Sequence, residues 1–597
     1  MKVILPKWGL PALTLFTFFF LLGSRSLNEP DEGRYSEIAR EMIETGNWLV
    51  PHFWYLPHLD KPPMAYWLVA ASMKLFGQNE WAARLPAALA GISGVWAAFL
   101  LGSSLGGRRA GFWSAVILQS SLLYFAMSRM LTPDILVTQF VAWAVYFFWR
   151  SWLVAAEGTR LKSKSEIELE PPCVGCYISP SGFFAWHLAG WVAIALGFMT
   201  KGPIALAIPL VAFTTLAIFR RREASGKILL AGFFAGFVLF LILAAPWFLA
   251  VFQRVPQSAH FMILGQAAGH LLGTTIKNRH GNPFYFFGIL AAGLLPWTFL
   301  LGWIFRSPKS GVQSPEPEIQ SAIGNRQSAI SSDGWLLLNV WAVFTFTLFS
   351  FSHAKLPAYI LPIFPALAVL LAVRFFNEER DAESAPRWAW RICLASSLLL
   401  PAVFPGLVKF AFHDELPGWM NWQTPVFALA ALLIFRRARR WKPSACAVGA
   451  TVLTLLSLAL TVAEIRLFEA GMRDNQTLKP LGDALRENYR PGDVLVCWGR
   501  FPQGLPFYSG TVISTTSRPY FGGMDLTQVP FEFPGNRERL GSLLLPDDNA
   551  LAQLLSGRRR VWVISFGDTA EKVQEARGAA PLRLVSRVGR WELFTSR

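Results

Sequence analysis

Long apolar segments, each long enough to cross a bilayer, recur along the 597-residue chain and constrain its fold more than any other feature. About 20 consecutive apolar residues span the hydrocarbon core of a membrane as a helix. Hydrophobic residues make up 53% of the chain and charged residues 16%, whereas roughly a quarter of the residues of a soluble protein are charged. The sequence therefore predicts an all-α polytopic membrane protein.

The apolar segments predict thirteen transmembrane helices. The first follows Lys2 and Lys7, and it lacks the small-residue cleavage pattern of a signal peptide, so we expect it to be retained. The expected spans lie near residues 8–23, 84–105, 110–127, 132–150, 184–200, 203–219, 228–251, 283–305, 334–352, 356–374, 388–411, 424–435 and 444–465.

Basic residues gather in every second loop between these spans, for example Arg108 and Arg109, then Arg220 to Arg222, then Arg436 and Arg437. Loops rich in Lys and Arg face the cytoplasm. This bias predicts a bacterial inner-membrane protein with a cytoplasmic N-terminus, and it puts the first loop (24–83) and the C-terminal region on the periplasmic face. The net charge of +17 is explained by these loops, so we expect membrane lipids and no nucleic acid as partners.

The composition changes after about residue 470. The stretches "PGDVLVCWG" and "RRRVWVISFG" are typical of short buried strands, and helical patterns surround them at 478–489 and 547–556. The sequence thus predicts a transmembrane domain over 1–469 and a small periplasmic α/β domain over 470–597.

The first loop holds the densest set of ionisable residues outside the basic loops. Residues 30–45 predict a helix, because Pro30 suits its first position and Gly46 suits the position after its end. An apolar stripe that includes Tyr35 and Met42 favours a helix lying along the membrane surface. Acidic residues in a first turn often serve only the helix dipole, so the loop alone leaves a structural role open.

Other ionisable residues are predicted on the same side of the membrane. "DKPP" places Asp60 and Lys61 in a stiff extended segment, and Asp134, Lys201 and Lys355 lie at the outer ends of later spans. Each could serve alone as a capping or snorkelling residue. Their shared side favours a common polar cavity, since ionisable residues at membrane depth are candidates for function.

The segment "NEPDEGRYSEIAREMIETGNWLVPHFWYLPHLDKPPMAYW", followed in order by "TPD", "TKGP", "HGNPFYFF" and "AKLPAYILP", resembles the C-type glycosyltransferases, and most closely their lipid A aminoarabinose transferase branch, which is related to the protein O-mannosyltransferases. The resemblance covers essentially the whole chain. It implies the GT-C fold and an inverting glycosyltransferase that takes a sugar from a polyprenyl-phosphate donor. The acceptor it implies is a lipid (lipid A-like), a glycan or a protein.

The resemblance also implies roles for residues. Asp31 matches the acidic position assigned to catalysis. Glu32 is the second catalytic candidate, but it points about 100° away from Asp31 on a helix, which favours a contact with a neighbouring group. Arg34 and Lys61 match positions for the donor phosphate, and Lys201 matches a position for that phosphate or for the acceptor. The implied cavity residues are Tyr35, Asp134, Lys355 and Tyr359, and the implied ligands of a divalent metal ion (Zn, Mg or Mn) are Asp60, one methylene shorter than the usual Glu, and His280.

A transporter or flippase for a lipid-linked sugar is the alternative, because it too needs polar groups at membrane depth. The clustering of charge at the outer surface rather than at the midplane favours the transferase. The sequence leaves the sugar and the acceptor open, and we expect a monomer.

Overall fold

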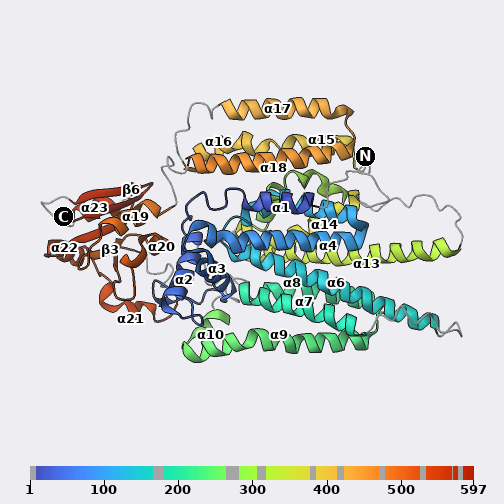
Figure 1. Cartoon of the computed structure of the whole chain (residues 1–597), viewed down its shortest axis with the longest axis horizontal. Coiled ribbons are helices and arrows are strands. Elements are labelled where there is room, and N and C mark those ends of the chain that lie inside the picture. Colours follow the sequence, from blue (N-terminus) through green and yellow to red (C-terminus); the bar gives the residue numbers. More distant parts are fainter. Residues whose placement is uncertain are drawn as a thin grey trace.

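The computed structural model describes residues 8–165, 180–263, 282–304, 318–376, 385–412, 422–468, 477–524, 533–567, 569–575 and 582–597. Figure 1 shows a bundle of long helices with a small α/β domain at one end, and the helices α2 and α3 of the first loop lie between the two. The mostly helical bundle and the C-terminal sheet confirm the predicted fold class.

The bundle consists of helices that follow the predicted spans. Their bounds are α1 Gly9–Phe19, α4 Glu80–Ser120, α5 Leu122–Met127, α6 Pro133–Ser165, α7 Pro180–Lys201, α8 Ile204–Phe219, α9 Gly226–Arg254, α10 Ser258–His260, α12 Tyr285–Gly293, η2 Trp297–Trp303, α13 Glu318–Phe351, η3 Pro357–Ile363, α14 Phe364–Phe376, α15 Arg387–Ser396, α16 Leu399–Phe412, α17 Gln423–Arg437, η6 Ala438–Arg440 and α18 Pro443–Phe468. Six helices of the described residues are long and apolar enough to cross a membrane, or eight if each bent pair is one span. The number thirteen stays a prediction.

The helix α4 contains two of the predicted spans, and the span predicted at 283–305 is not a straight helix. The helix α4 turns back on itself at Gly106 and Gly107, whose backbone is not helical. A Cβ on Gly111 would lie 2.6 Å from the carbonyl oxygen of Phe99, so the two halves of α4 pack side by side and represent two spans. The segment predicted at 283–305 is broken, because α12 and η2 meet at 116°.

The helix α14 forms the centre of the bundle. All of its residues, Phe364–Phe376, are buried, and it packs against α4, while α6 packs against both α4 and α7. On the outside, α9 exposes large apolar side chains such as Leu230 and Phe234. A large exposed apolar surface of this kind fits contact with lipid.

The C-terminal domain is built on a five-stranded sheet with the strand order β4-β3-β5-β7-β6. The strand β3 runs parallel to β4 and β5, and β7 runs antiparallel to β5 and β6. Strands β3 and β5 and helices α19 and α22 lie where the sequence predicts them. The bounds are α19 Lys479–Asn488, β3 Val494–Trp498, α20 Leu505–Ser509, η8 Gly510–Val512, β4 Tyr520–Gly522, α21 Asn536–Leu540, η9 Gly541–Leu543, α22 Asp548–Ser556, β5 Val561–Phe566, α23 Thr569–Glu575, β6 Arg583–Val588 and β7 Trp591–Thr595.

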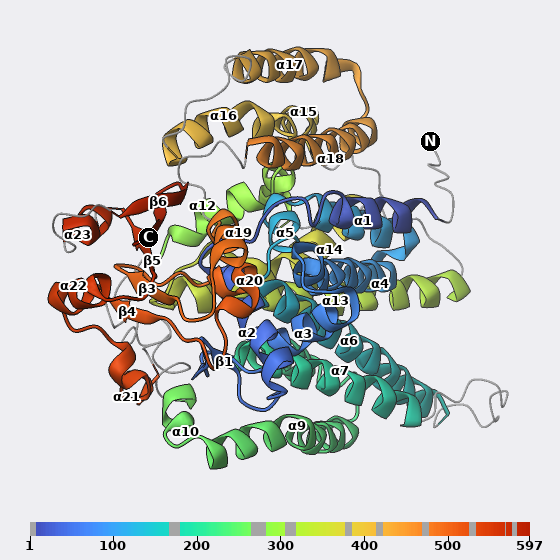
Figure 2. The same cartoon turned by 60° about the vertical axis from the view of Figure 1, so that its left-hand side comes forward.

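The first loop folds as α2 (Asp31–Thr45), a hairpin of β1 (His52–Phe53) and β2 (Leu56–Pro57), and α3 (Met64–Phe76). The expected helix is therefore present, and it ends at Gly46 with φ +68°. It does not expose a polar face as a surface helix would, because the residues from Glu32 to Met42 are all buried. Figure 2 shows the reason: the bundle lies on one side of α2 and the C-terminal domain on the other.

Candidate active site

Asp31 and Arg34 form an ion pair at the start of α2. An Nη atom of Arg34 donates to Oδ1 of Asp31 at 2.6 Å. The Asp31 side chain is 47% exposed, whereas that of Arg34 is 10% exposed. The pair thus presents an accessible carboxylate whose partner cation is held inside the protein, as a group that must meet a substrate requires.

Asp60 and Lys61 form a second ion pair in the segment between β2 and α3. Nζ of Lys61 donates to Oδ1 of Asp60 at 2.9 Å. Burial raises the pKa of Asp60, but Lys61 together with His58 and Arg34 outweighs this and holds that pKa below its usual range. The influence of Arg34 on Asp60 indicates that the two ion pairs belong to one cluster.

Three polar atoms around these pairs are buried and lack a hydrogen-bond partner within the described part of the chain: Nε of Arg34, Nε2 of His58 and the hydroxyl oxygen of Tyr66. The rings of Tyr66 and Tyr35 stack with centroids 5.4 Å apart. A buried polar atom without a partner costs about 1–3 kcal/mol, so this arrangement fits a site whose polar groups are satisfied by a bound ligand.

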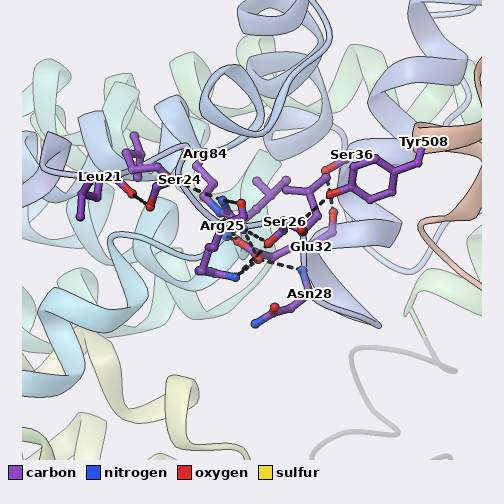
Figure 3. Close-up of polar contacts among 12 residues, drawn as sticks. Leu21, Ser24, Arg25, Ser26, Asn28, Glu32, Ser36, Arg84 and Tyr508 are labelled. Atoms are coloured by element: carbon purple, nitrogen blue, oxygen red, sulfur yellow. Dashed lines mark hydrogen bonds and ion pairs between the residues drawn. The ribbon is translucent and has the colours of Figure 1, made fainter. Parts of the chain in front are cut away.

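Glu32 lies next to Asp31 in the sequence but is enclosed by donors (Figure 3). Arg25 and Arg84 each donate to it at 2.8 Å, and the backbone N–H groups of Asn28 and Leu131 donate at 3.0 and 3.2 Å. Burial raises the pKa of Glu32, but the two arginines outweigh this and hold it well below its usual range. These contacts tie α2 to the bundle and use both of its carboxylate oxygens.

Arg84 and Glu32 are both fully buried, so the pair predicts a large effect on stability. Glu32→Gln is expected to lower the free energy of unfolding by about 3–5 kcal/mol, because it leaves buried arginine charge uncompensated. The measurement is thermal unfolding in detergent with Glu487→Gln, an exposed acid on α19, as the control. If Glu32→Gln lost activity at an unchanged melting temperature, Glu32 would act in the chemistry as the resemblance implies.

Three of the other predicted residues meet where one end of α6, one end of α7 and the helix η3 come together. Asp134, at the start of α6, pairs with Lys201, at the end of α7, and Nζ of Lys201 lies 4.3 Å from the centre of the Tyr359 ring. Asp134 lies near the first loop, because Leu131, whose backbone N–H donates to Glu32, is three residues before it in the sequence. This group is a second polar cluster beside the first.

Lys355 has a different environment from these residues. Its Nζ donates to the carbonyl oxygens of Phe349 and Ser350 at 2.8 and 2.6 Å. These carbonyls belong to the last turn of α13, where a cation interacts favourably with the helix dipole. The structure thus places Lys355 as a cap at the C-terminal end of α13.

The predicted metal ligands are only partly covered by the structure. Oδ1 of Asp60 is paired with Lys61, and His280 lies outside the described residues. Among the residues that are described, no three His, Cys, Asp or Glu side chains gather as a metal site would require. A divalent metal ion held by Asp60 and His280 therefore stays a prediction.

Several residues of the cluster were missed by reasoning from the sequence: His58, Tyr66, Arg25 and Arg84. Only the last two carry a charge, and Arg84 is 52 residues from its partner Glu32. His58 follows β2 in the pattern "PHLDK", two positions before Asp60. Its proximity in the sequence to Asp60 was the one signal that could have drawn attention to it.

His58 gives a prediction for pH dependence. Burial lowers its pKa from 6.5 to about 3, so the folded protein binds fewer protons at this residue than the unfolded chain does. The contribution of neutral His58 to stability is complete above pH 6.5 and is lost as the pH falls toward 3. At pH 5 the loss is about 2 kcal/mol.

We therefore expect the melting temperature of the wild type to fall more than that of His58→Gln between pH 7.5 and pH 5. The control is His353→Gln, an exposed histidine, which should follow the wild type. Equal decreases in the wild type and in His58→Gln would contradict the burial of a neutral imidazole.

Comparisons with known proteins agree with this geometry. Residues 60–158 match the family model described as dolichyl-phosphate-mannose-protein mannosyltransferase. The undecaprenyl phosphate-α-4-amino-4-deoxy-L-arabinose arabinosyl transferase of Aeromonas salmonicida is 32% identical over 83% of this chain and 84% of its own. That of Edwardsiella ictaluri is 32% identical over 78% of both chains. The chain belongs to this transferase family.

The protein is accordingly a membrane glycosyltransferase, as the resemblance of its first loop implied. A solved structure gives the same fold: ArnT from Cupriavidus metallidurans bound to undecaprenyl phosphate has a TM-score of 0.73 and 20% identity, and the match covers 99% of both chains. The transferase fold therefore extends over the C-terminal domain as well as the bundle.

Proposed function

We propose that the transferase moves a sugar from a polyprenyl phosphate to an acceptor in the outer leaflet of the bacterial inner membrane. The observation that supports this most is the cluster around Asp60 and Asp31. It combines an exposed carboxylate, the cations Arg34 and Lys61, and buried polar atoms without partners in the described residues. Cations stabilise the charge that develops on a leaving phosphate.

The sugar and acceptor are proposed from the family. The curated relatives are named for 4-amino-4-deoxy-L-arabinose carried on undecaprenyl phosphate, and we propose the same class of aminopentose donor here. For the acceptor we propose a lipid A-like glycolipid, in preference to a polysaccharide or a secreted protein. Because the lipid donor is embedded in the membrane, the reaction takes place where the first loop meets the bundle.

The chemistry follows from which groups are accessible. An acceptor oxygen attacks the anomeric carbon in line with the bond to the phosphate oxygen, and that bond breaks with its electron pair leaving on the polyprenyl phosphate. The configuration at the anomeric carbon is inverted. If the acceptor group is a hydroxyl, Asp31 takes its proton. If the acceptor is already anionic, no proton has to be removed, and Asp31 acts by holding the Arg34 guanidinium in place through their ion pair. Arg34 and Lys61 hold the leaving phosphate.

The predicted orientation is part of the proposal. The basic residues between the spans support a cytoplasmic N-terminus, and the first loop and C-terminal domain then face the periplasm. Single cysteines at exposed positions 487 and 108 test this in whole cells. We expect an impermeant thiol reagent to label the first and not the second, and the reverse pattern would contradict the orientation.

The donor class is tested with purified protein in detergent. The expected result is transfer from a polyprenyl phosphate that carries an aminopentose, with lipid A as acceptor, and at least tenfold slower transfer from a neutral hexose donor. Transfer to a protein or polysaccharide in place of lipid A would change the acceptor class, while transfer from no polyprenyl donor would overturn the proposal.

A further inference from the structure

The C-terminal domain contacts the chain two residues before Asp31. The backbone N–H of Gln503 donates to Oε2 of Glu29 at 2.8 Å, and the N–H of Gly504 donates to Oε1 at 2.6 Å. Glu29 itself is buried, with 9% of its surface exposed. Both of its oxygens are therefore directed at the loop that precedes α20, which lies more than 470 residues away in the chain.

Two glycines bring the backbones together at this contact. A Cβ on Gly33 would lie 2.8 Å from Cα of Gly504, and a Cβ on Gly504 would lie 2.9 Å from Cα of Gly33. Either Cβ would also meet Oε1 of Glu29. Since real Cβ atoms do not approach other atoms so closely, a side chain at either position would separate α2 from the C-terminal domain.

Further hydrogen bonds from the C-terminal domain flank the same part of the first loop. The hydroxyl of Tyr508 accepts from the backbone N–H of Leu27 at 2.7 Å. Arg518 donates to the carbonyl oxygen of Tyr55 at 2.7 Å, and the side chain of Asn536 donates to that of Pro57 at 3.0 Å. The domain thus holds the chain before the Asp31–Arg34 pair and again between that pair and the Asp60–Lys61 pair.

We propose that Glu29 is a positioning residue, through which the C-terminal domain fixes the first turn of α2 in the geometry that turnover needs. Glu29 lies two residues before Asp31, and Gly33 directly precedes Arg34. A shift of either end of this turn would move the carboxylate of Asp31 and the guanidinium of Arg34 together. Displacing a reacting group by about 1 Å can reduce a rate about 10²-fold. The proposal rests on the proposed function for the reaction that Asp31 serves.

The test uses the full-length protein with Glu29→Ala and Gly504→Ala. We expect kcat to fall about 10- to 100-fold and the KM for the donor to change less than about threefold, because no group that binds the donor is removed. Amide hydrogen exchange of residues 31–36 should become faster in both variants. Glu29→Gln, which keeps an oxygen acceptor, should retain more of the rate, and Glu487→Ala should match the wild type.

Two results would overturn the proposal. One is a lower melting temperature for Glu29→Ala with unchanged kcat in the folded fraction, which would make the contact merely structural. The other is unchanged exchange over residues 31–36. If the wild type transferred no sugar, the proposed function would fail, and exchange would decide this inference alone: faster exchange in Glu29→Ala would support it and unchanged exchange would overturn it.

Discussion

Asp31→Asn is expected to reduce turnover of a polyprenyl-phosphate sugar by about 10²- to 10⁴-fold, the range found when a catalytic carboxylate loses its charge. The substitution keeps the size of the side chain and an oxygen that can accept from Arg34, which now donates to Asp31 at 2.6 Å. Because the Asp31 side chain is 47% exposed, we expect the fold and the donor affinity to persist. Initial rates over a range of donor concentrations measure the turnover and the KM for the donor.

The control for this variant is Glu487→Gln, which removes an exposed carboxylate from α19. We expect it to retain wild-type turnover. If Asp31→Asn kept a tenth or more of the wild-type rate, Asp31 would not be the group on which the reaction depends. Loss of folded Asp31→Asn protein would instead indicate a structural role for the ion pair.

Lys61→Ala is expected to reduce kcat/KM for the donor by about 10²- to 10³-fold, the usual cost of removing a group that stabilises transition-state charge. The ammonium group of Lys61 lies 2.9 Å from Asp60, so its removal also leaves that carboxylate without its nearest cation. Both effects work against binding a phosphate. The measurement is kcat and KM for the donor, together with direct binding of polyprenyl phosphate.

Two further variants sharpen this result. Lys61→Arg keeps the charge and should retain more activity than Lys61→Ala. Lys74→Ala removes an exposed lysine from the end of α3 and should behave as the wild type. Unchanged binding of polyprenyl phosphate to Lys61→Ala would contradict a role in holding the phosphate.

The sequence predicted which residues form the active site better than it predicted what surrounds them. Asp31, Arg34, Asp60 and Lys61 could be found because they lie close together in one loop and because their pattern resembles a known family. The strands β3 and β5 could be found because short buried strands have a distinct composition. In each case the signal was local in the sequence.

The features that were missed depend on contacts between distant residues. The burial of α2 on all sides follows from docking of the C-terminal domain, and the hydrogen bonds from Gln503 and Gly504 to Glu29 join residues 474 and 475 positions apart. Nothing in the helical pattern of residues 30–45 shows that a second domain covers its polar face. The surroundings of Glu32 likewise depend on Arg84, which lies near the start of α4 and not in α2.

One turn in the membrane bundle, the break within the segment predicted at 283–305, was missed for a related reason. Hydropathy marks apolar segments, but it does not show whether a segment is straight. The break between α12 and η2 arises from local backbone geometry between Gly293 and Trp297. The reversal within α4 at Gly106 and Gly107, by contrast, lies between two spans that the sequence predicted separately. The number of spans is for this reason harder to predict than their existence.

The most direct test of the central claim is one reaction in detergent that contains purified protein, a radiolabelled polyprenyl-phosphate aminopentose and lipid A. We expect labelled lipid A and released polyprenyl phosphate in equal amounts, formed by the wild type and not by Asp31→Asn. No labelled product from the donor, combined with movement of the same donor across liposomes that contain the protein, would contradict the account and establish a transporter.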